Sequence, residues 1–250
     1  MYRFYISPEQ YDGNKIQILG EDVNHIKNVL RMREGETLIC CDGAGMEYYC
    51  EVEELKKEYI LVEVKEAKRS ENELPVRLIL LQGLPKKDKM ELIIQKAVEL
   101  GVAEIVPVMT KRTVVKLEDA KKEEKKRERW QAIAVSAAKQ SGRGVIPTVH
   151  HVMSWKEMLD YIKHFDYNII LYENAEGMKA TKECISAVTK KSCASIIVGP
   201  EGGFEETEVA QAIEAGAVSV SLGHRILRTE TAGFTMLSAL MLEAEYQMER

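Results

Sequence analysis

Two glycine-rich turns near the end of the chain contain the residues best suited to chemistry. The first, SIIVGPEGGF (195–204), and the second, VSVSLGHRILRTETAGF (218–234), each follow a short β-branched run and lead into a helical pattern. Glycines let main-chain N–H and C=O groups approach a ligand closely, and the start of a helix favours negative groups. This pattern suits a small cofactor held largely by backbone. A tight strand-to-helix turn that binds nothing is the alternative interpretation.

Familiar nucleotide and metal motifs do not fit these turns. Dinucleotide binding requires G-x-G-x-x-G, but Glu201 stands where the second glycine belongs. A P-loop requires Gly-Lys-Ser/Thr at a position that Phe204 and Glu205 occupy. The sequence has no HExxH, GxSxG or paired Cys/His set, and the adjacent histidines at 150–151 are more typical of structural residues. We therefore expect no metal site.

The composition indicates a globular protein. The chain has 250 residues, of which 45% are hydrophobic and 30% charged. No apolar run approaches the roughly 20 residues of a membrane span, and the first residues lack a signal-peptide pattern, so we expect a cytoplasmic protein. The cysteines are odd in number and lack zinc spacing, which predicts reduced packing thiols at Cys40, Cys41, Cys50, Cys184 and Cys193.

The charge distribution argues against binding of nucleic acid by bulk electrostatics. The formal net charge is −5. Residues 1–72 contain 10 Lys+Arg against 15 Asp+Glu, and residues 73–250 contain 25 of each. A basic surface must therefore be a local patch that folding creates.

Two domains follow from the change in periodicity along the chain. Residues 1–72 show short alternating runs, which predict the strands of a small barrel, and one helical segment with Val23, Ile26, Val29 and Leu30 on a shared face. The polar stretch 69–74 is the expected linker. Residues 73–250 alternate strands with helices, which predicts a mostly parallel α/β sheet covered on both faces.

The last helix has a broad apolar stripe. Leu237, Leu240, Met241 and Ala244 share one face, and further apolar residues lie beside it. This stripe is wider than one core requires. We therefore expect the chain to form a homodimer.

Several strings make the whole chain similar to one known family. They are RF at residues 3–4, HIKNVLR at 25–31, KMELIIQKAVELGVAEIVPV at 89–108, WQAIAVSAAKQSGR at 130–143, and above all VGPEGGF and LGHRILRTETA. With these strings the chain resembles the RsmE-type 16S ribosomal RNA uridine-N3 methyltransferases of the SPOUT superfamily. The matches extend from residue 3 to residue 232, so they cover both predicted domains.

The resemblance implies a specific fold and activity. Residues 1–72 are expected to form a PUA-like RNA-binding β-barrel, and residues 73–250 a SPOUT-type α/β domain with a C-terminal trefoil knot. Members of the family bind S-adenosyl-L-methionine in the knot loops, act as homodimers, and methylate N3 of a uridine in 16S rRNA of the small ribosomal subunit. Periodicity alone predicts neither the knot nor the cofactor.

The resemblance also suggests roles for individual residues. Arg228 is expected to contact the anion that develops on uracil, with a salt bridge at the last helix as the alternative. Glu201 is expected to orient the base, or to accept a proton if burial raises its pKa, with loop architecture as the alternative. The expected cofactor-binding residues are Leu171, Gly199, Glu201, Gly203, Leu222, Gly223, Ile226, Leu227 and Arg228. The expected RNA-binding residues are Arg3, Lys86, Lys87, Lys89, Lys111, Arg112 and Arg143.

The sequence departs from the family pattern at Asn24, where a histidine is common, and at Glu205, where Ser or Thr is the usual helix N-cap. Two other functions stay open at this point. One is a related knotted methyltransferase that acts on another RNA. The other is a catalytically silent RNA-binding assembly factor that uses the barrel.

Overall fold

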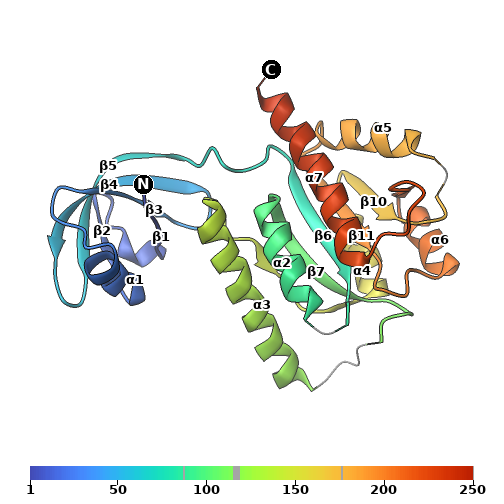
Figure 1. Cartoon of the computed structure of the whole chain (residues 1–250), viewed down its shortest axis with the longest axis horizontal. Coiled ribbons are helices and arrows are strands. Elements are labelled where there is room, and N and C mark those ends of the chain that lie inside the picture. Colours follow the sequence, from blue (N-terminus) through green and yellow to red (C-terminus); the bar gives the residue numbers. More distant parts are fainter. Residues whose placement is uncertain (87, 115–118, 176, 250) are drawn as a thin grey trace. The chain divides into compact units, whose positions relative to one another are not determined.

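The computed structural model describes residues 1–86, 88–114, 119–175 and 177–249. The chain divides into two compact units (Figure 1). The first unit comprises Met1–Glu73 and Ala138–Ile146, and the second comprises Leu74–Ala137 and Pro147–Arg250.

The first unit is built on a five-stranded sheet in the order β1-β3-β4-β5-β2. β1 and β3 are parallel, and the other neighbouring strands are antiparallel. Two register shifts between β4 and β5 act as bulges, which bend the strands so that the sheet curls around its core. The strands are β1 (Arg3–Tyr5), β2 (Lys15–Ile18), β3 (Thr37–Cys41), β4 (Met46–Leu55) and β5 (Ile60–Arg69), and a short η1 (Pro8–Gln10) precedes β2.

The predicted helix of the first unit has an irregular second half. The α-helix α1 (Glu21–Asn24) continues as the π-helix η2 (His25–Val29). A π-helix makes hydrogen bonds over five residues instead of four, so its turn is wider and the 3.6-residue face is not kept. As a result Val29 is 65% exposed, and its predicted place on the buried face was wrong. Arg31 ends the segment in the left-handed region, with a φ of 54°.

A return segment, Ala138–Ile146, completes the first unit. The Glu73 carboxylate accepts hydrogen bonds from the backbone N–H groups of Gly144 and Val145 at 3.0 and 3.1 Å. Val145 also forms a β-bridge with Gly43. Residues far apart in the sequence therefore stabilise the same small fold.

The second unit contains a seven-stranded parallel sheet, as the alternating pattern predicted. Six strands run in the order β12-β10-β11-β6-β7-β8, and β9 also pairs with β7. The strands are β6 (Arg77–Gly83), β7 (Val102–Met109), β8 (Thr148–Val149), β9 (Met153–Ser154), β10 (Tyr167–Leu171), β11 (Cys193–Val198) and β12 (Ala217–Val220).

Helices cover both faces of this sheet. On one face, side chains of α4 and α6 pack against Ile79, Leu81 and Ile197. On the other face, α2 and α7 lie side by side (Figure 1). The helices are α2 (Lys89–Glu99), α3 (Ala120–Ser141), α4 (Trp155–Ile162), α5 (Lys179–Val188), α6 (Glu206–Glu214) and α7 (Thr229–Met248).

The cysteines are free thiols, which confirms the sequence prediction. Four are buried, and Cys193 is half-buried at the start of β11. Among the helices of the described residues, none is long and apolar enough to cross a bilayer.

Candidate functional site

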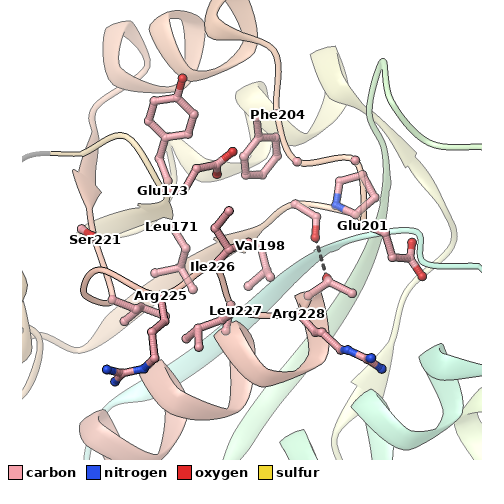
Figure 2. Close-up of a pocket in the computed structure, with 18 of the residues that line it drawn as sticks. Leu171, Glu173, Val198, Glu201, Phe204, Ser221, Arg225, Ile226, Leu227 and Arg228 are labelled. Carbon is pink, nitrogen blue, oxygen red and sulfur yellow. Dashed lines mark hydrogen bonds between the residues drawn. The ribbon is translucent and has the colours of Figure 1, made fainter.

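A cavity of the second unit lies where three neighbouring parallel strands end. β12, β10 and β11 are adjacent, so the loops that follow them meet at one edge of the sheet. These loops, within residues 171–173, 198–204 and 220–229, line a pocket of about 400 Å³ together with Lys89 and Ala232 (Figure 2). A cavity of this size is typical of small-molecule sites.

The structure brings the expected cofactor residues together. They lie in three separate loops, yet all of them line this pocket: Leu171, Gly199, Glu201, Gly203, Leu222, Gly223, Ile226, Leu227 and Arg228. Leu171 and Val198 form a buried apolar floor, whereas Ile226 is 90% exposed. The apolar floor and the glycine backbone above it suit a ligand with a flat apolar part.

Two of the pocket glycines have a backbone conformation that other residues rarely adopt. Gly203 and Gly223 have φ values of 68° and 100°. In addition, a Cβ atom at Gly203 would lie 3.3 Å from Oε1 of Glu173. Both turns therefore require glycine for their shape, and the absent side chains leave main-chain groups open to the pocket.

A buried hydrogen-bond relay joins the two turns. Nε2 of Gln82, which is fully buried, donates to Oγ1 of Thr229 at 2.8 Å. Oγ1 of Thr229 in turn donates to the Gly199 carbonyl at 2.5 Å, the contact that is dashed in Figure 2. The relay fixes the start of α7, and thus Arg228, against the first turn. The sequence did not point to either residue. Gln82 lies near the end of a buried strand and Thr229 begins a helix, and neither position indicates a partner that is distant in the sequence.

Loss of the Thr229 hydroxyl is expected to loosen this junction. Thr229→Val keeps the shape but removes both hydrogen bonds of a residue that is 6% exposed, so we expect a loss of about 1–3 kcal/mol in the free energy of unfolding. Thr229→Ser is the matched control, because it keeps the hydroxyl and removes one methyl group. We expect it to lower the free energy of unfolding by about 0.8 kcal/mol. Urea denaturation of both variants measures the difference. Equal losses would show that the hydroxyl contributes nothing.

Glu201 anchors the first turn. Its carboxylate accepts hydrogen bonds from the backbone N–H of Lys86 at 3.1 and 3.2 Å and pairs with Nζ of Lys89 at 3.2 Å. Burial alone would raise the pKa of Glu201, but the backbone N–H groups of Glu201 and Lys86 and the ammonium of Lys89 hold it below its usual value. This direction is opposite to the raised pKa that a proton-accepting role requires. The geometry favours a positioning role.

The stabilisation by Glu201 is expected to depend on pH. A carboxyl whose pKa is lowered on folding stabilises the fold above its unfolded pKa of about 4.3, and this contribution is lost as the pH falls through the folded value. Glu201→Gln should therefore be less stable than wild type at neutral pH, and the difference should shrink below about pH 4. Urea denaturation across this range measures it. Glu214→Gln, at an exposed site on α6, is the control. A difference that is independent of pH would contradict the assignment.

Arg228 lies at the N-cap position of α7 and lines the pocket. Its side chain is exposed, and the guanidinium makes no hydrogen bond or ion pair with any of the described residues. The salt bridge at the last helix, which was the alternative interpretation, is therefore absent among the described residues. Figure 2 shows the guanidinium at the rim of the pocket on the Glu201 side, pointing outward.

The expected RNA-binding residues fall into two groups. Lys89 lines the pocket, and Lys86 precedes α2. The backbone N–H of Lys111 donates to Oε1 of Glu208 in α6 at 2.8 Å, and Nη1 of Arg112 donates to the Gly202 carbonyl of the first turn at 3.0 Å. In this first group Lys89 is paired with Glu201 and Glu230, and Lys111 with Glu205. The second group lies in the first unit, where the guanidinium groups are also paired with carboxylates.

In that second group, Arg3 pairs with Glu47 at 2.5 Å, and Arg143, which is 4% exposed, pairs with Glu73 at 2.5 Å. Phosphate contact through either side chain would require its ion pair to open. Lys87 lies outside the described residues.

Two family models match the sequence. An RNA methyltransferase domain matches residues 72–241, and an RNA methyltransferase PUA domain matches residues 18–65. The first match covers more than half of the chain and contains all three loops of the pocket.

Curated relatives and a solved structure agree with these models. The chain is 43% identical to ribosomal RNA small subunit methyltransferase E of Bacillus subtilis (strain 168), over 98% of each chain. It is 35% identical to the protein of the same name from Mesomycoplasma hyopneumoniae (strain 232), over 95% of this chain and 98% of the other. A crystal structure of ribosomal RNA small subunit methyltransferase E from Neisseria gonorrhoeae, bound to S-adenosyl methionine, superposes with a TM-score of 0.81 at 34% identity, over 97% of each chain.

Proposed function

Because the chain belongs to the ribosomal RNA small subunit methyltransferase E family, we propose that it methylates N3 of a specific uridine in 16S rRNA, with S-adenosylmethionine as the methyl donor. The observation that carries the proposal is the convergence of three strand-end loops on one pocket of about 400 Å³. We propose residues 1–72 as the RNA-binding barrel, which the return segment Ala138–Ile146 completes, and the rest of residues 73–250 as the methyltransferase domain.

The pocket fits this cofactor. Gly203 and Gly223 expose backbone groups, and Leu171, Val198 and Leu227 offer apolar surface for an adenine ring. When bound, S-adenosylmethionine supplies an electrophilic methyl group. We propose that the loops at 199–203 and 222–228 hold it, and that they belong to the trefoil knot that the family resemblance implies.

The charged groups at the rim of the pocket can stabilise the negative charge that develops on the uracil during methylation. Methylation at N3 requires loss of the imide proton, and negative charge then spreads over the two flanking carbonyl oxygens. Arg228 is proposed to donate to this anion, because a guanidinium stays charged and donates in a fixed fork. Glu201, held by Lys86 and Lys89, is proposed to position the turn beside it rather than to take the proton.

The basic residues around the pocket are proposed to contact the RNA backbone. The chain has a net charge of −5, so attraction to phosphate depends on local cations. The proposed contacts are Lys86, Lys89, Lys111 and Arg112. Because bacterial relatives act on ribosomal RNA, we place the protein in the cytoplasm.

A homodimer is part of the proposal, with α7 in the interface. Most of the predicted stripe, including Leu237 and Leu240, is buried within the chain itself. Leu242 and Tyr246 of α7 nevertheless stay 62% and 50% exposed, and Leu92 of the neighbouring α2 is 44% exposed. We expect light scattering to give a mass of two chains at micromolar concentration, and Leu242→Arg to shift it toward one. A wild-type monomer would remove the dimer from the proposal.

Methylation of isolated small subunits tests the function. Subunits from a strain that lacks this protein are incubated with the purified chain and S-adenosylmethionine, and nucleosides are identified by mass spectrometry. We expect 3-methyluridine in 16S rRNA. A methylated base elsewhere would indicate a knotted methyltransferase for another RNA. Failure to bind S-adenosylmethionine in calorimetry would indicate a silent RNA-binding factor.

A further inference from the structure

Glu173 is the pocket carboxylate to which the mechanism above gives no role. It follows β10 directly, lines the pocket and is exposed. Within the described residues its side chain makes no hydrogen bond or ion pair, whereas Glu201 has two partners. A free carboxylate inside a ligand pocket offers two acceptor oxygens to whatever binds there.

This carboxylate lies against the first glycine turn. Its Oε1 lies 3.3 Å from the point that a Cβ of Gly203 would occupy, so it fills the space above the first glycine turn. Figure 2 shows Glu173 beside Phe204, with Leu171 below them, and Glu201 and Arg228 on the other side of the pocket. One end of the pocket thus combines an acceptor with apolar surface, and the other end has the cations.

These two ends match the two halves of the cofactor. An adenosine carries an apolar ring next to a vicinal diol, and a carboxylate is the acceptor that many nucleotide sites use for ribose hydroxyls. The amino-acid half carries both charges and needs a cation for its carboxylate. Lys89, which is paired with Glu201 and Glu230, and Arg228 lie at the Glu201 end. Figure 2 shows Arg225 on the opposite side from Arg228, with both guanidinium groups pointing outward from the rim.

We propose that the Glu173 carboxylate accepts hydrogen bonds from the ribose hydroxyls of the cofactor, an inference that rests on the proposed function. It thereby fixes the orientation of the cofactor, with adenosine at the Phe204 end and the amino-acid half toward Arg228. Glu173 is a binding residue in this assignment and takes no part in proton transfer.

Isothermal titration with two ligands tests the assignment. S-adenosylhomocysteine contains both halves of the cofactor, and 5′-methylthioadenosine lacks the amino acid but keeps the ribose. We expect Glu173→Ala to weaken both ligands by the same factor, roughly 10- to 100-fold, because hydrogen bonds to a charged acceptor are lost. Glu173→Gln, which keeps one acceptor oxygen, should lie between. Glu214→Gln should bind both ligands like wild type.

The outcomes separate the alternatives. If Glu173→Ala weakens only S-adenosylhomocysteine, the carboxylate faces the α-amino group and the ribose assignment is overturned. If both affinities stay unchanged, Glu173 is a solvated side chain and the proposal fails while the proposed function stands. If the wild-type protein binds neither ligand, both proposals fail. As a second readout, 5′-methylthio-2′-deoxyadenosine, which keeps only the 3′-hydroxyl, should bind wild type more weakly than its parent and show a smaller further loss with Glu173→Ala.

Discussion

Arg228→Ala is expected to lower kcat about 10²- to 10³-fold while the fold persists. The loss corresponds to removal of one preorganised donor to a developing anion. The side chain is exposed and makes no contact with a described residue through hydrogen bond or ion pair, so the free energy of unfolding should change by less than about 0.5 kcal/mol. Steady-state methylation of small subunits and urea denaturation measure the two quantities.

Arg228→Lys separates charge from geometry. A lysine keeps the positive charge but loses the planar fork, so we expect an intermediate rate. Cofactor affinity, measured by calorimetry on all three proteins, shows whether the defect lies in binding or in the chemical step. Wild-type turnover in Arg228→Ala would remove this residue from the mechanism.

Gly83→Ala is expected to displace the first glycine turn. Gly83 ends β6, and a Cβ atom there would lie 2.6 Å from Cδ and 2.7 Å from the backbone nitrogen of Pro200. Because one of these atoms belongs to the backbone, a rotamer change does not relieve the clash. We expect a loss of about 1–3 kcal/mol in the free energy of unfolding and a clear loss of cofactor affinity. Urea denaturation and calorimetry measure the two effects.

Gly233→Ala is the matched control for this substitution. Gly233 lies in α7, where an added Cβ would be 3.8 Å from Cγ2 of Val198, an ordinary contact. Alanine in a helix is favoured over glycine by about 0.5–1 kcal/mol, so this variant should be as stable as wild type or more stable. Similar losses at both positions would contradict the steric argument.

The sequence predicted elements and turns better than it predicted the contacts between them. Apolar periodicity located the strands, and the glycines identified where the pocket would form, because both signals are local. The prediction that Val29 shares a face with Val23 and Ile26 was wrong, because the wider turn of a π-helix rotates Val29 away from that face, and the residue pattern gives no sign of such a turn. The lowered pKa of Glu201 depends on Lys86 and Lys89, which lie far from it in the sequence. Such pairings become visible only once the sheet order is known.

The first unit consists of two segments that are separated in the sequence, Met1–Glu73 and Ala138–Ile146. The return segment Ala138–Ile146 is synthesised only after α2, β7 and most of α3 have been made. Until then, Glu73 lacks the N–H groups of Gly144 and Val145 that it binds in the finished fold. The first unit therefore cannot complete its folding until Ile146 has been synthesised, and β8 to β12 of the sheet follow later still. An excised fragment that ends at Glu73 would leave this carboxylate without those partners and Gly43 without its bridge to Val145.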